Sequence, residues 1–264
     1  QILGNGENNI INTVKNSIIS GKNNNITNSN DSSIQGITNT IDQINYSIVT
    51  GSTNNITNLT NSTITGQSQL INNGTNITVL GNENDITAEL SSLISGNVNI
   101  VKNGENNTIF GTGNELDNNN DTLVNGEKNM VNDCLETIVF GNNNTKSNTI
   151  NSLVSGKGNN EEKGYYNVVF GANNKVYDSS ANLVSGIDND LSNNTYSGVI
   201  GNTHNIISSN QVFTSGFNNT ITNSLQSSSF GYENILNNSS RSMLSGYTNN
   251  DSSGESNLSS GFGN

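Results

Sequence analysis

The sequence predicts an all-β fold, a parallel β-solenoid or β-roll of about 18 turns with 15 residues in each turn. Three observations carry this prediction. Glycine recurs every fifteen residues, aliphatic residues recur at fixed distances from it, and the segment of four or five residues rich in Val and Ile before each glycine is too short for a helix. A strict period is typical of repeat proteins, in which a unit buries its apolar face by stacking on its neighbours. The repeated glycines are Gly6, Gly21, Gly36, Gly51, Gly66, Gly81, Gly96, Gly111, Gly126, Gly141, Gly156, Gly171, Gly186, Gly201, Gly216, Gly231, Gly246 and Gly261.

We number each repeat from its glycine, which is position 0. Position −2 is β-branched or leucine in nearly every repeat, and position +5 is aliphatic in 14 of 17 repeats. The segment around −2 is rich in Val and Ile and therefore has strand propensity. Glycine at 0 and asparagine at +3 tolerate the positive φ that a sharp corner requires. Each repeat is predicted as strand, corner, strand, corner, with two aliphatic side chains pointing inward.

Position +3 is asparagine in 16 of 18 repeats, with Gln69 and His204 as the exceptions. Stacked turns would place these side chains above one another, where amides hydrogen-bond along the stack. We therefore predict a structural Asn ladder, with ligand binding by it as the alternative. Its members include Asn24, Asn39, Asn54, Asn84, Asn99, Asn114, Asn129, Asn144, Asn159, Asn174, Asn189, Asn219 and Asn234.

A second pattern begins at Gly81. Position −1 alternates between a bulky apolar and a polar residue from turn to turn, and position −3 is bulky where −1 is polar. In a strand both positions face away from −2, so this apolar stripe points outward if −2 points inward. Exposed apolar patches usually mark interaction sites, so we predict that the stripe mediates self-association. The apolar stripe comprises Leu80, Phe110, Phe140, Phe170, Ile200 and Phe230 at −1, and Leu93, Leu123, Leu153, Leu183, Phe213 and Met243 at −3.

A coil of thirty residues would also explain the alternation, because the two kinds of repeat would then lie on different walls of a wider solenoid. The fifteen-residue coil is the preferred interpretation. Earlier repeats lack the alternation and carry Ser20, Gln35, Thr50 and Thr65 at −1, so any partner contact should weaken there.

Two consecutive repeats interrupt the aliphatic column, with Lys146 and then Glu161 at +5. We expect either that Ile150 and Tyr165 at +9 supply the core there, or that the corner bulges outward. Irregular packing is the preferred interpretation, and the alternative is a bulge with Glu161, Tyr165 and Tyr166 that acts as a recognition knob.

The composition excludes several function classes. The net charge of −12 disfavours nucleic acid as a partner, because binding its phosphates requires clustered Lys and Arg. No apolar run approaches the ~20 residues of a transmembrane helix, so this segment should not insert into a membrane. No acid, base and nucleophile converge in the pattern, and His204 has no second His or Cys to share a metal with. We therefore expect no enzyme activity, no metal and no cofactor.

The repeat also resembles that of a known family. Glu136-Thr137-Ile138-Val139-Phe140-Gly141-Asn142-Asn143-Asn144 is similar to the head repeat of YadA-like trimeric autotransporter adhesins. The resemblance implies a left-handed parallel β-roll, association of three chains, and binding of host matrix or cells at a bacterial surface. The period of fifteen, and Val or Ile at −2 where the family usually has alanine, depart from that pattern.

Taken together, residues 1–264 are expected to form one repetitive domain, either a segment of a longer protein or a filament subunit. The leading hypothesis is a secreted, extracellular or cell-surface structural protein whose solenoid associates with copies of itself into a fibre or filament. The resemblance implies two alternatives within this frame, a trimer and an adhesin head that binds host or cell-surface ligands. Ice binding by a flat wall is a minor alternative, because threonine occurs only intermittently at +6 and −4.

Overall fold

The computed structural model describes residues 2–13, 15–28, 30–43, 45–58, 60–87 and 90–264. It contains two compact units, Gln1–Leu135 and Glu136–Asn264. Each unit is a parallel β-solenoid with 15-residue turns, and the chain comprises about 18 turns. The described ranges contain strands, bridges, turns and bends but no helix. The predicted fold class is therefore confirmed.

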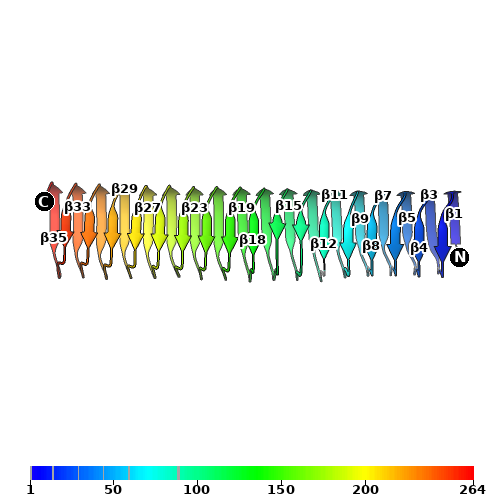
Figure 1. The fold of residues 1–264 in the computed structure, drawn as a ribbon, viewed down its shortest axis with the longest axis horizontal. Helices are drawn as coiled ribbons and strands as arrows, with labels where there is room; N and C mark the ends of the chain where they lie inside the picture. The colour runs from blue at the N-terminus through cyan, green and yellow to red at the C-terminus, as the bar shows by residue number, and fades with distance from the viewer. Residues whose placement is uncertain (1, 14, 29, 44, 59, 88–89) are drawn as a thin grey trace. The chain divides into compact units, whose positions relative to one another are not determined.

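Each turn begins with a long strand that covers positions −3 to +1, with slightly longer strands in the first two turns (Figure 1). In the first unit the long strands are β1 (Ile2–Glu7), β3 (Ser17–Lys22), β5 (Ser33–Ile37), β7 (Ile48–Ser52), β9 (Thr63–Gln67), β11 (Thr78–Asn82), β13 (Leu93–Asn97), β15 (Thr108–Thr112) and β17 (Leu123–Glu127). In the second unit they are β19 (Ile138–Asn142), β21 (Leu153–Lys157), β23 (Val168–Ala172), β25 (Leu183–Ile187), β27 (Gly198–Asn202), β29 (Phe213–Phe217), β31 (Ser228–Tyr232), β33 (Met243–Tyr247) and β35 (Leu258–Phe262).

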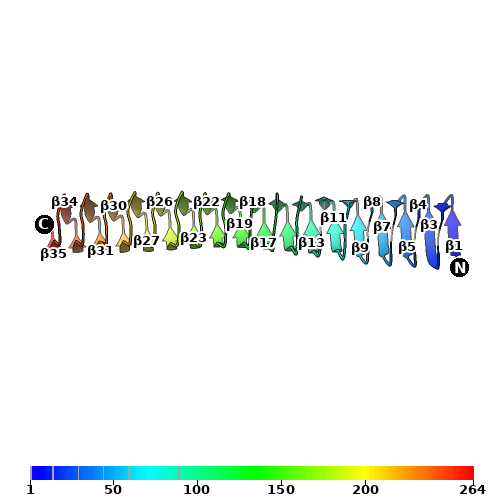
Figure 2. The same ribbon diagram turned by 90° about the horizontal axis from the view of Figure 1, so that it is seen from below.

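A short strand follows at positions +4 to +6 and lies on the other side of the turn (Figure 2). In the first unit the short strands are β2 (Ile10–Asn12), β4 (Asn25–Thr27), β6 (Thr40–Asp42), β8 (Asn55–Thr57), β10 (Leu70–Asn72), β12 (Asp85–Thr87), β14 (Ile100–Val101), β16 (Glu115–Leu116) and β18 (Met130–Asn132). In the second unit they are β20 (Thr145–Ser147), β22 (Asn160–Glu162), β24 (Lys175–Tyr177), β26 (Asp190–Ser192), β28 (Asn205–Ile207), β30 (Thr220–Thr222), β32 (Ile235–Asn237) and β34 (Asn250–Ser252).

Neighbouring turns pair in register at a separation of fifteen residues. Val139 pairs with Val154, and Gly141 pairs with Gly156. The same offset joins Val169 to Val184 in the next pair of long strands. A thirty-residue coil would place residues thirty apart in adjacent strands, so that alternative is wrong.

The turn has three walls rather than the two that were predicted. Single-residue bridges at position +9, such as Tyr165 to Ser180, form the third wall between the short strand and the next long strand. Three corners separate the walls, and each has a residue with positive φ at +2, +7 or +10. In the turn that starts at Gly171 these residues are Asn173, Asp178 and Ala181, with φ of 55°, 47° and 56°.

In most turns the residues that follow the positive-φ corners are polar and buried. In the turn that starts at Gly171 these residues are Asn174 at +3, Ser179 at +8 and Asn182 at −4 of the following repeat. The prediction that the +3 asparagine itself adopts positive φ is therefore wrong, because that conformation belongs to position +2. The sequence pattern placed the corner one residue too late.

Five columns of side chains point into the solenoid. Positions −2 and +5 form the two aliphatic columns that were predicted, with Val184 and Leu191 as examples at 0% exposure. Positions −4, +3 and +8 add three polar columns along the corners. The interior is therefore built from more polar columns than apolar ones, which explains how a chain that is only 30% hydrophobic forms a packed stack.

The glycine at position 0 is required by both conformation and space. Gly156 has φ of 131°, a region that side chains with a β-carbon rarely adopt. A β-carbon on Gly156 would also overlap the carbonyl oxygen of Gly171 in the next turn. The fifteen-residue recurrence of glycine is thus a direct consequence of the close stacking of long strands.

Candidate functional site

The predicted Asn ladder exists in each unit. Asn174 represents it: its Nδ2 donates to Asn159 Oδ1 at 3.0 Å and to the carbonyl oxygen of Gly186 at 2.9 Å. Its Oδ1 accepts hydrogen bonds from the main-chain N–H and the Nδ2 of Asn189, at 3.1 and 2.9 Å. The amide is fully buried and its donors and acceptor are used within the stack. These bonds make the ladder a structural element.

Both exceptions at +3 keep the ladder connected. Gln69 Oε1 accepts from the N–H and Nδ2 of Asn84, and its Nε2 donates to the carbonyl oxygen of Gly81. His204 Nδ1 accepts the N–H of Asn219 at 3.2 Å, and its Nε2 lies 3.2 Å from the carbonyl oxygen of Ile200. This arrangement requires the neutral imidazole with the proton on Nε2. Burial lowers the pKa of His204 below its usual value.

The side chains of the apolar stripe lie on the outer face of the long strands. At −1, Phe140, Phe170 and Ile200 are 37%, 39% and 41% exposed, while the −2 residues between the stripe positions are buried. At −3, Leu183 and Met243 are exposed, and Leu153 is partly exposed. The outward orientation inferred from strand alternation therefore holds. Whether the stripe binds another chain stays a prediction.

The bulky residue of the apolar stripe lies at position −1 in one turn and at position −3 in the next. The ring of Phe213 at −3 lies over Gly198, the −3 residue of the preceding turn, so that a β-carbon there would lie 2.7 Å from Phe213 Cδ2. On its other side the same ring contacts Phe230 at −1 of the next turn, with ring centroids 5.7 Å apart. Phe213 therefore leans across the position where the preceding turn has glycine.

Position +1 carries an aromatic stack that the sequence analysis missed. Phe217, Tyr232, Tyr247 and Phe262 lie above one another with centroid distances of 5.1, 4.7 and 5.0 Å and nearly parallel rings. They occupy the long-strand face beside the stripe. The signal that could have revealed them is four consecutive aromatic residues at one phase of the repeat, in the last four turns only.

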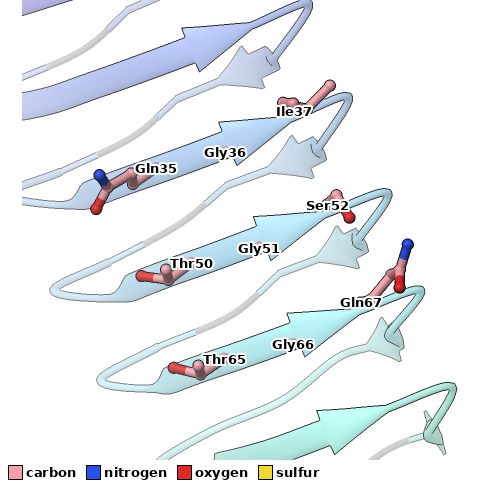
Figure 3. Close-up of a pocket in the computed structure, with 9 residues that line it drawn as sticks. All are labelled: Gln35, Gly36, Ile37, Thr50, Gly51, Ser52, Thr65, Gly66 and Gln67. Carbon is pink, nitrogen blue, oxygen red and sulfur yellow. The ribbon is translucent and has the colours of Figure 1, made fainter.

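Each unit has a shallow hollow on the surface formed by its described residues. The first lies in the first unit, where Gly36, Gly51 and Gly66 form its floor between two rows of side chains (Figure 3). The rows are Gln35, Thr50 and Thr65 on one side and Ile37, Ser52 and Gln67 on the other. The second hollow lies in the second unit over the corner at Asn218, Glu233 and Thr248. The first has no ionisable side chain and the second has a single carboxylate, so neither brings together an acid, a base and a nucleophile.

The predicted recognition knob does not exist as a unit. Glu161 is fully buried, whereas Tyr165 and Tyr166 are 48% and 63% exposed on the outside of the turn. The corner does not bulge, because residues 160–162 form the regular strand β22. Ile150 and Tyr165 do not replace the core residues either, because both lie in the outer bridge wall. Placing Glu161 on the surface was therefore wrong.

Lys146 and Glu161 instead remain in the +5 column and form a buried ion pair. Lys146 Nζ lies 3.4 Å from Glu161 Oε2, and both side chains have 0% exposure. Lys146 Nζ also donates to the carbonyl oxygen of Ser152 at 2.9 Å. Glu161 Oε1 accepts a hydrogen bond from Asn167 Nδ2 at 2.8 Å. Burying an ion is costly unless a counter-ion and hydrogen bonds compensate for lost water, and this cluster supplies both.

In the described ranges, no group of three His, Cys, Asp or Glu side chains is arranged to hold a metal ion. Nor does any helix occur there with the length and apolar character needed to cross a bilayer. The one cysteine, Cys134, is buried at +8 in the first unit.

No protein-family model matches the sequence, and no curated protein matches it. Among solved structures, a putative acetyltransferase from Desulfovibrio desulfuricans G20 is similar at 9% identity, with 95% of this chain and 67% of that chain covered and a TM-score of 0.19. The polySia-specific acetyltransferase NeuO is similar at 14% identity, with 70% and 79% covered and a TM-score of 0.13. At these scores the similarity carries no inference about activity.

Proposed function

We propose that the chain is a non-enzymatic structural protein of the cell surface or extracellular space, in which the apolar stripe packs against copies of the same chain to build a fibre or filament. The observation that carries the proposal is the row of exposed bulky apolar side chains at −1 and −3 of the long strands. Soluble proteins seldom expose contiguous apolar patches of this kind unless a partner covers them.

The lack of charged residues at the stripe positions supports a protein partner for the outer face of the long strands. The chain has 30 acidic and basic residues, and none of them occupies position −3 or −1 in any repeat. The charges lie at the corners, on the other walls and, in four turns, at +1. Depletion of charge is typical of the centre of protein interfaces, where a buried ion would lose its hydration.

The stagger of the stripe favours a second copy of the chain as that partner. A bulky residue at −1 alternates with serine along the second unit, as in Phe140, Ser155, Phe170 and Ser185. A copy displaced by one turn, about 4.8 Å along the stack, would set its bulky side chains opposite the small ones. The same surface thus supplies both the projections and the recesses that close packing needs.

The test replaces bulky stripe residues and measures assembly. The double variant Phe140→Ser/Phe170→Ser should keep the circular dichroism spectrum of the wild type, because both side chains already face solvent. It should shift sedimentation profiles towards monomer and reduce the filaments or bundles seen by electron microscopy. Tyr166→Ser, which replaces an exposed aromatic residue at a corner outside the apolar stripe, is the matched control and should assemble like the wild type.

Two outcomes would contradict the proposal. One is a wild-type chain that stays monomeric across the whole concentration range, and the other is a double variant that assembles as the wild type does. Loss of assembly or of cell binding in Tyr166→Ser alone would instead favour the adhesin alternative, with the exposed Tyr165 and Tyr166 as its contact.

A further inference from the structure

We propose that Lys146 and Asn167 become joined by an intramolecular isopeptide bond, with Glu161 as the proton carrier. The bond would link the side chains of two consecutive turns in the second unit. This proposal is independent of self-association, because all three residues lie inside the solenoid at 0% exposure.

A single carboxylate contacts both reacting groups. Glu161 Oε2 lies 3.4 Å from the amine of Lys146, and Glu161 Oε1 accepts the hydrogen bond of 2.8 Å from the amide nitrogen of Asn167. A carboxylate in this position can take a proton from the amine and deliver one to the amide nitrogen. Amide exchange between the two side chains requires such a shared proton carrier.

The carbonyl group of Asn167 is polarised for attack. Its Oδ1 accepts hydrogen bonds from the main-chain N–H of Asn182 at 3.0 Å and from Asn182 Nδ2 at 3.1 Å. When an amine adds to the carbon, negative charge develops on this oxygen. Two fixed N–H donors in a buried site stabilise such an oxyanion.

Lys146 and Glu161 depart from the aliphatic column in consecutive turns, beside one of the turns that has asparagine at −4. Position +5 is otherwise aliphatic in most turns, and position −4 is usually a small polar residue where this turn has Asn167. Gly164 at +8 makes room for the cluster, because a β-carbon there would overlap Asn167 Nδ2 and lie 2.6 Å from Glu161 Oε1.

The chain contains an internal comparison for this cluster. Asp251, Gly254 and Asn257 repeat the same positions, and Asn257 Nδ2 donates to Asp251 Oδ1 at 2.8 Å. The neighbouring turn has Leu236 in the +5 column, so no amine is present. An acid and an amide without an amine therefore form only a hydrogen bond. The amine of Lys146 is the additional group that the reaction at Asn167 requires.

The reaction balances without an external reagent. Lys146 Nζ gives one proton to Glu161 and attacks Asn167 Cγ with its lone pair, so that the Nζ–Cγ bond forms and the C=O electron pair moves to Oδ1. Glu161 passes a proton to Nδ2 and takes a second proton from Nζ. The C=O bond re-forms, the Cγ–Nδ2 bond breaks, and ammonia leaves. Glu161 retains one proton, so the product has an amide and a neutral acid in place of a buried ion pair.

Mass spectrometry of the folded full-length chain tests the proposal. The wild type should be lighter than its sequence by one ammonia, and digestion should yield a branched peptide that joins the segments containing Lys146 and Asn167. The branched peptide is the criterion, because other asparagine and glutamine side chains can also lose ammonia. Glu161→Gln should give no branched peptide, whereas Glu162→Gln, which changes the neighbouring and partly exposed carboxylate, should give the same branched peptide as the wild type.

A second variant distinguishes loss of the reaction from loss of folding. Lys146→Val/Glu161→Val restores the aliphatic column, so it should fold and give no branched peptide. The proposal is overturned if folded wild-type protein yields Lys146 and Asn167 only in separate, unmodified peptides. It is also overturned if Glu161→Gln forms the branched peptide as completely as the wild type.

Discussion

Removing one amide from the Asn ladder should open the stack locally. In Asn174→Ala, Asn189 loses the acceptor of its buried main-chain N–H, and the bonds from Asn174 Nδ2 to Asn159 Oδ1 and Gly186 O disappear. An orphaned buried N–H costs about 1 to 3 kcal/mol and each lost bond about 1 kcal/mol, so the expected destabilisation is about 3 to 5 kcal/mol.

Hydrogen exchange on the full chain is the suitable assay, because a repeat stack can open over a few turns without unfolding elsewhere. The amide of Asn189 should exchange roughly a hundredfold faster or more in Asn174→Ala, since every 1.4 kcal/mol corresponds to about a factor of ten. Asn205→Ala removes an exposed asparagine from the same unit and should leave exchange nearly unchanged. A change below about tenfold at Asn189, or an equal effect of Asn205→Ala, would refute the structural role of the ladder.

Two further predictions concern other inward columns. The pKa of His204 is lowered by burial, so its contribution to stability is complete above the unfolded value of about 6.5 and is lost as the pH falls through the lower folded value. The unfolding midpoint of the wild type should therefore fall more steeply below about pH 6.5 than that of His204→Asn, and parallel curves would contradict this. Thr214 lies at −2 with a buried hydroxyl that has no hydrogen-bond partner among the residues that the structure describes. Thr214→Val should raise the free energy of unfolding by about 1 kcal/mol in denaturant titrations, and a loss of stability would show that the hydroxyl is satisfied in solution.

The period and the aliphatic columns could be predicted because they depend on residues with few substitutes. Only glycine fits the close contact at position 0, and an interior position such as that of Val154 favours an aliphatic side chain. Strand alternation then places Phe140 outside once Val139 is inside. These steps require nothing beyond the spacing of residue types.

The polar columns of the interior could not be predicted in the same way, because the residue types at positions −4 and +8 change together from turn to turn. Gly164 accompanies the larger Asn167, whereas Asn194 accompanies the smaller Ser197, so volume is conserved across the corner while neither column keeps one residue type. Small polar residues also resemble those of an exposed loop. Only the stacked hydrogen bonds, such as Asn194 N–H to Ser179 Oγ at 3.1 Å, reveal that they face inward.

The Lys146 and Glu161 cluster was misread for a related reason. A single Lys or Glu in a sequence indicates an exposed position, because charged side chains are rarely buried. Their separation of fifteen residues places the opposite charges one above the other in adjacent turns, which the structure shows as the pairing of β20 with β22. Comparing substitutions at the same phase in neighbouring repeats would have indicated the ion pair.

The three polar columns inside each turn also affect how stability responds to temperature. Exposing apolar surface on unfolding raises the heat capacity, and exposing polar surface lowers it. A solenoid that buries side chains such as Asn174, Ser179 and Asn182 beside a thin aliphatic layer should therefore have a heat-capacity increment below the usual value of about 12 to 15 cal/mol/K per residue. Its stability curve is correspondingly flat, and cooling weakens it less than it weakens a protein with a large apolar core.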